Sequence, residues 1–227
     1  MSRVRQAPGG GRVVEVESER LAAWLNRFAG RNDGIASITG TLSSVTVTAT
    51  DGSTATLTVP FPPMAIGDEE PVQALLTHIA GLGAIAVILV RAGAFSVGIA
   101  AHGTVLTSST DTRYVQSRTA AGGWSQQRYA RRRGNQRRDA QRAAADAAHR
   151  VLAPVAGTLR ALVVGGEAGA IRAVLADPRL SLLADLPRRT FTDIAEPRRA
   201  VLDEIAVRCL SVQITVRGPS ETAEPAD

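Results

Sequence analysis

The chain of 227 residues contains one cysteine and no lysine. A single thiol, Cys209, excludes an intramolecular disulfide and a cysteine-based metal cluster. No run of 18 apolar residues is present, which excludes a membrane-spanning helix. The basic, glycine-rich start over residues 1–12 lacks the apolar segment of a secretory signal. We therefore expect a cytoplasmic protein. Aromatic residues make up only 4%, so its core must be built from Ala, Val, Leu and Ile.

All 26 basic residues are arginine, and the formal charge is +5 with a pI of about 10.7. Arginine pairs bidentately with phosphate and stacks on bases, so this bias suits contact with RNA. It equally suits the codon usage of a GC-rich genome. Composition alone does not choose between these interpretations, but the placement of the charges can.

Apolar periodicity and turn residues predict the order of the elements. Helices are expected after Ser18, near Pro71, after Ala140, after Gly166 and from Pro197. Strands are expected at 35–59 as a hairpin, at 84–90, 94–100, 104–108, 112–118, 159–164, 191–194 and 210–216. This order predicts an α/β (α+β) fold over 13–217: one compact domain with a mixed sheet covered by helices. The hairpin would be an accessory piece, residues 1–12 a disordered basic arm, and 218–227 an acidic flexible tail.

The strongest functional signal is a basic segment over residues 118–142. Asp139 is its only acid, and Trp124 and Tyr129 offer aromatic surfaces for stacking. Its eight arginines are Arg118, Arg128, Arg131, Arg132, Arg133, Arg137, Arg138 and Arg142. So many like charges repel one another unless an anion lies nearby, which favours RNA contact over a solvated helix start.

Other residue patterns that could indicate a catalytic nucleophile, a metal site or a nucleotide-binding loop are weaker. Ser125 lacks the second glycine of a nucleophile elbow. The three histidines are scattered and show no metal-ligand spacing. Gly165-Gly166 resembles a dinucleotide loop only faintly, and a plain turn from strand to helix explains it better.

The segment Gly122-Gly123-Trp124-Ser125-Gln126-Gln127 resembles the GxxQ-type loop of the Vms-like release-factor family. That family is similar to the catalytic domain of eukaryotic and archaeal class I release factors, which use a Gly-Gly-Gln loop. The resemblance to its bacterial branch extends over most of residues 13–217. It includes the segment 13–28, Arg113-Tyr114-Val115 and the turn at 163–166.

The resemblance implies a release-factor catalytic fold and hydrolysis of the ester between a nascent peptide and tRNA, freeing stalled chains in ribosome-associated quality control. Gln126 matches the catalytic glutamine when counted from Gly123, and Gly122 and Gly123 match the glycines. In class I factors the glutamine directly follows the glycine pair, so Gln127 stays open as an alternative. The implied partners are the large ribosomal subunit, its RNA and peptidyl-tRNA, with no cofactor, no membrane and a monomeric protein. The competing hypothesis is a non-catalytic RNA-binding or ribosome-binding module that uses the same segment for docking.

Overall fold

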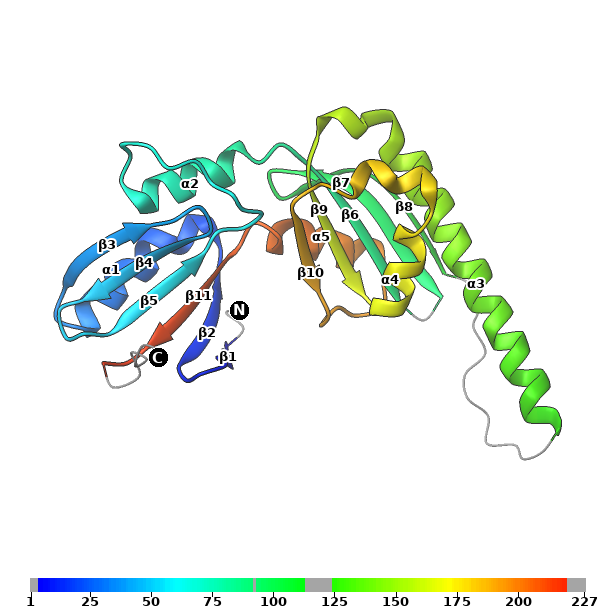
Figure 1. Cartoon of the computed structure of the whole chain (residues 1–227), viewed down its shortest axis with the longest axis horizontal. Helices are drawn as coiled ribbons and strands as arrows, with labels where there is room; N and C mark the ends of the chain where they lie inside the picture. The colour runs from blue at the N-terminus through cyan, green and yellow to red at the C-terminus, as the bar shows by residue number, and fades with distance from the viewer. Residues whose placement is uncertain (1–3, 92, 113–123, 220–227) are drawn as a thin grey trace, which may run out of the picture. The chain divides into compact units, whose positions relative to one another are not determined.

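The computed structural model describes residues 4–91, 93–112 and 124–219, and over 124–130 it describes the backbone (Figure 1). Contacts divide the chain into two compact units. Unit 1 consists of residues 1–81 and 210–227, and unit 2 of residues 82–209. Unit 2 is therefore inserted in the sequence between two parts of unit 1.

Unit 1 is built on a six-stranded antiparallel sheet in the order β1-β2-β11-β5-β4-β3. Its strands are β1 (Val4–Gln6), β2 (Arg12–Val16), β3 (Ile35–Gly40), β4 (Ser44–Ala49), β5 (Thr54–Thr58) and β11 (Val212–Arg217). Alternate residues of β4, such as Val45 and Val47, are fully buried, whereas Thr46 and Thr48 lie on the other face. This period of two is the pattern of a sheet with one covered face.

Two helices supply apolar side chains to the core of unit 1. The short 3₁₀ helix η1 (Ser18–Arg20) leads into α1 (Leu21–Arg31), which buries Leu21, Leu25 and Phe28 at a helical spacing. Helix α2 (Pro71–Gly81) buries Ala74, Leu75 and Ile79. Both helices were expected from the sequence and are confirmed.

The structure corrects two expectations for unit 1. Residues 4–6 were expected to lie in a disordered arm, but β1 pairs with β2, and the Ala7 backbone N–H donates to Gly11 O across the turn. The 35–60 hairpin was expected as an accessory to one sheet. Instead it belongs to a separate sheet, because β11 pairs with both β2 and β5.

Unit 2 carries a mixed five-stranded sheet in the order β10-β9-β6-β7-β8. The strands are β6 (Ala84–Arg91), β7 (Ala94–Ala101), β8 (Thr104–Thr112), β9 (Leu159–Gly166) and β10 (Arg188–Phe191). Strand β9 runs parallel to β6 and β10, while β6, β7 and β8 form an antiparallel meander. The apolar run at 84–90 is the central strand, as expected. The α+β class is confirmed, with two sheets in place of one.

Helices cover both faces of the unit 2 sheet. Helix α3 (Trp124–Leu152) and α4 (Ala168–Leu175) share one core with Ile88, Val97 and Leu162. The 3₁₀ helices η2 (Ala153–Thr158) and η3 (Pro178–Leu183) flank them. Helix α5 (Arg199–Arg208) packs on the other face, where Leu202 lies opposite Gly98.

Helix α3 begins sixteen residues before Ala140, where the sequence analysis placed the first of its small side chains. The polar segment was not assigned to a helix because no apolar stripe marks it. Arginine, glutamine and alanine are nevertheless good helix formers, so the helix extends through this segment although none of its described side chains between 131 and 139 is buried. In Figure 1 this part of α3 runs past the end of the unit 2 sheet.

Candidate nucleic-acid interface

The N-terminal half of α3 is a solvated basic helix. Its described residues from 131 to 139 are exposed or half-buried, and the first buried side chain is Ala140. From there on, Ala144, Ala147, Ala148 and Leu152 are fully buried against the sheet. The C-terminal half of α3 is thus anchored on the sheet, whereas its described side chains between 131 and 139 face solvent.

Five of the arginines predicted to bind RNA have described side chains, and all five are exposed: Arg131, Arg132, Arg137, Arg138 and Arg142. At 100° per residue, Arg131, Arg138 and Arg142 fall within about 40° of one another, opposite the line of buried alanines. Arg132 and Arg137 lie on the two flanks of that row. The sequence therefore places positive charge around much of this helix.

These five arginines differ in their pairing from four others in unit 2: Arg179, Arg198, Arg199 and Arg208. Within the described parts of the chain, none of the five forms an ion pair, and Arg138 donates only to Asn135 Oδ1, at 2.6 Å. By contrast, Arg198 pairs with Glu196 at 2.7 Å and Arg199 with Asp203 at 2.9 Å. Charge left without a counter-charge on α3 is available to an anionic partner.

The remaining predicted site residues cannot be placed as side chains. Gly122, Gly123 and Arg118 lie outside the described residues. Of five others the structure gives the helical backbone position alone: Trp124, Gln126, Gln127, Arg128 and Tyr129. Arg133 lies within the same helix between described neighbours.

The two glutamines occupy different sides of the first turn of α3. Gln126 precedes the buried Ala144 by about five full turns, so both positions lie on one line along the helix. Gln127 lies about 100° further around the axis. Because the two positions face different directions, substituting each glutamine in turn can separate their roles.

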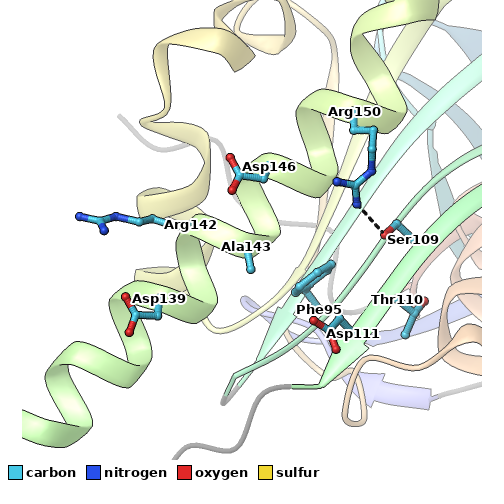
Figure 2. A pocket seen from close by; sticks show the side chains of 9 residues that line it. All are labelled: Phe95, Ser109, Thr110, Asp111, Asp139, Arg142, Ala143, Asp146 and Arg150. Carbon is cyan, nitrogen blue, oxygen red and sulfur yellow. Dashed lines mark hydrogen bonds between the residues drawn. The ribbon is translucent and has the colours of Figure 1, made fainter.

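An open cavity of about 640 Å³ lies between α3 and the edge strand β8. It is lined by Phe95, Ser109, Thr110, Asp111, Asp139, Arg142, Ala143, Asp146 and Arg150. Arg150 crosses from the helix to the strand and donates to Ser109 Oγ at 3.3 Å. Figure 2 shows that Arg142 and Asp146 point away from β8.

On its other side α3 is held by an ion-pair network from η3. Arg179 donates to Asp146 Oδ1 at 2.7 Å and to Asp177 Oδ2, also at 2.7 Å. Asp177 is the N-cap of η3 and accepts from the Arg179 backbone N–H at 3.0 Å. These hydrogen bonds from Arg179 lower the pKa of the Asp177 carboxyl to about 2, so it stays ionised at neutral pH.

Sequence reasoning missed Arg150, Ser109, Asp146 and Arg179. No local pattern marks them, because the pairs join residues about 30 to 40 positions apart in the chain. The sequence offered only an indirect signal. Asp146 and Arg150 lie four residues apart among the alanines of α3, on the side of the helix that is exposed.

The described residues contain no group of three His, Cys, Asp or Glu side chains arranged to hold a metal ion. His78 is instead engaged with the backbone, since its Nε2 lies 2.8 Å from Pro60 O. No helix in the described parts of the chain is long and apolar enough to cross a membrane.

Residues 83–215 match the sequence model of a family described as the Actinobacteria/chloroflexi VLRF1 release factor. This match includes α3 and nearly all of unit 2. No curated protein matches the chain. Among solved structures, the mitochondrial localization core of Vms1 is similar with a TM-score of 0.46 and 13% identity, covering 77% of this chain and 76% of that one. The archaeal translation termination factor aRF1 gives a TM-score of 0.32 and 13% identity, covering 87% of this chain and 66% of its own.

Proposed function

The chain belongs to the Actinobacteria/chloroflexi VLRF1 release-factor family, and from this premise we propose that it hydrolyses the ester of peptidyl-tRNA on the large ribosomal subunit. The observation that carries the proposal is the row of arginines on α3 without counter-charges, leading to the Gly-Gly-Trp-Ser-Gln-Gln segment. The product would be a nascent chain freed from a stalled ribosomal complex in the cytoplasm.

The arginines supply the binding part of this function. Ribosomal RNA presents closely spaced phosphates, and each guanidinium that contacts one releases condensed counterions. Arg131, Arg138 and Arg142 form one row along the helix, so they can contact successive phosphates. Binding through them would direct the N-terminal end of α3 towards the RNA.

The reaction would add water to the ester carbonyl carbon. The water oxygen forms the new bond, the bond to the ribose oxygen of tRNA breaks, and that oxygen leaves with a proton. The amide of Gln126 does not ionise in the working pH range, so it cannot be a general base. Its role would be to hold the attacking water, while backbone N–H groups near Gly122 and Gly123 support the oxyanion.

The same arginines also support a second function. A module that docks on ribosomal RNA without catalysis needs the charge of α3 but not the glutamine. The two functions differ in one respect: a docking module keeps its full effect when Gln126 and Gln127 are both replaced.

The direct test is incubation of the protein with large subunits that carry labelled peptidyl-tRNA. We expect released peptide from the subunits and little from peptidyl-tRNA free in solution, because the ribosome provides most of the reaction site. Stoichiometric binding to the subunits without any release would instead identify the docking module.

A further inference from the structure

The start of helix α3, where Gln126 lies, is far along the helix from the contacts that attach it to the rest of unit 2. Asp146, which is paired with Arg179, lies twenty residues after Gln126 on the same continuous helix. At 1.5 Å per residue this separation is about 30 Å, so a tilt of about 5° at Asp146 would move the backbone at Gln126 by about 2.6 Å. A displacement of this size is large on the scale of catalytic geometry.

The apolar side chains of α3 that lie nearest its exposed basic segment are small. The buried face consists largely of alanines: Ala140, Ala144, Ala145, Ala147 and Ala148. Helices are held in register by side-chain ridges that enter grooves of the neighbouring element, and methyl groups form only low ridges. Such a surface allows close approach to the sheet but resists sliding and tilting weakly.

Directional contacts come instead from two polar pairs about one turn apart. Asp146 binds Arg179, whose guanidinium is already oriented by Asp177 through bonds of 2.9 and 2.7 Å. Arg150 reaches across to Ser109 on β8 (Figure 2). The pairs attach the helix to η3 and to the edge of the sheet.

The cavity between α3 and β8 is lined by Ser109, Asp146 and Arg150 of these pairs, and it extends along α3 towards Gln126 as far as Asp139. Asp139 and Arg142 line that cavity, and neither forms an ion pair in the part of the chain that the structure describes. The pairs at Asp146 and Arg150 thus attach α3 close to the point where its exposed basic segment begins.

We propose that Asp146 and Arg179, with Asp177 behind them, and Arg150 with Ser109, are positioning residues that set the direction of α3 and thereby the location of Gln126. This inference rests on the proposed function for its catalytic consequence. The mechanical part, the direction of the helix, stands independently of it.

The test uses the full chain with Arg179→Ala and, as a milder change, Asp146→Asn. Arg199→Ala is the matched control, because Arg199 is a comparably exposed arginine of unit 2 that pairs with Asp203 and contacts β8 but not α3. Spin labels on cysteines introduced at Thr104 and Arg131 report the direction of the helix by pulsed distance measurement. Cys209 is buried, so the labels react at the introduced thiols.

We expect a narrow distance distribution for the otherwise unchanged protein and for Arg199→Ala, and a broader or shifted one for both positioning variants. An unchanged distribution in Arg179→Ala and Asp146→Asn would overturn the proposal.

In unlabelled protein, the positioning variants should release peptide about 10- to 100-fold more slowly at saturation. Their affinity for subunits should stay within about twofold, because no RNA-binding arginine is changed. A broadened distribution with full release rates would overturn the claim for Gln126. If the unchanged protein releases nothing, the proposed function fails, while the distance measurement still decides the positioning role.

Discussion

At the residue scale, the backbone conformation at position 166 requires glycine. It has φ of +107°, and an added Cβ would lie 2.2 Å from Val90 O, at the point where β9 turns into α4. We expect Gly166→Ala to reduce the free energy of unfolding by roughly 2–5 kcal/mol, through the strained φ and the clash together. Urea unfolding measures this directly.

Gly169 is the control three residues later. It lies inside α4, and nothing is within 4 Å of an added Cβ. Gly169→Ala should therefore leave stability unchanged or raise it by up to about 1 kcal/mol. If Gly166→Ala were equally harmless, the turn would not have the geometry described.

Cys209 makes a second prediction at this scale. Burial raises the pKa of its thiol from 9.0 to about 12. Above pH 9 the unfolded chain therefore loses this proton while the folded chain keeps it. The free energy of unfolding should fall by about 1.4 kcal/mol per pH unit between pH 9 and 12, relative to Cys209→Ala. Parallel pH profiles of the two proteins, from denaturant titrations, would contradict the buried thiol.

At the element scale, the solvated half of α3 should be dispensable for folding but needed for function. Gly134 lies between the buried alanines and Gln126, and an added Cβ there meets only Arg138 Nη1, at 3.8 Å. Gly134→Pro should interrupt the helix and abolish release, since proline removes a backbone hydrogen bond and clashes with the preceding turn. The thermal midpoint should change little, because the described side chains of residues 131–139 are exposed or half-buried.

Gly134→Ala keeps the helix and should release peptide normally. Circular dichroism would verify that the proline variant loses helix while the alanine variant does not. Full release by Gly134→Pro would show that a continuous α3 is unnecessary.

The same helix predicts the salt dependence of binding. The affinity for large subunits should fall as the salt concentration rises. Replacing both Arg131 and Arg138 with alanine should make the negative slope of log affinity against log salt shallower by about 1 to 2, because two phosphate contacts are lost. Arg198→Ala is the control, since Arg198 is exposed but already paired with Glu196. Equal slopes for both variants and the unchanged protein would remove the electrostatic role of α3.

At the scale of the whole molecule, charge is divided between the two units. Unit 2 carries nineteen arginines against ten acids, and unit 1 carries seven against eleven. Under the proposed function, the attraction to RNA would therefore come mainly from unit 2, which also holds α3. The family match covers nearly the same part of the chain.

The sequence predicted most elements but not how they combine. Val45, Val47 and Leu57 marked the β4–β5 hairpin because a half-buried strand shows a period of two. The pairing of β11 with β2 and β5 joins residues about 150 to 200 positions apart, and no local pattern reveals it. The start of α3 was missed for a different reason: the described side chains before Ala140 are not buried, so this part of the helix shows no apolar period.

For the site, the sequence located the basic segment and its alternatives, Gln126 and Gln127. It could not show which arginines have counter-charges, since ion pairs such as Arg179–Asp146 form only in the folded chain. Among the described residues, Arg131, Arg132, Arg137, Arg138 and Arg142 form no ion pair, and only the folded structure could show this.

The central claim is that Gln126 positions the attacking water, and its most direct test is peptide release by Gln126→Ala from large subunits carrying labelled peptidyl-tRNA. We predict a loss of about 10²- to 10³-fold in rate with subunit binding nearly intact, because one neutral side chain contributes little to a charge-driven affinity. Gln127→Ala should cost much less. Release at the unchanged rate by both variants would contradict a glutamine-dependent hydrolase.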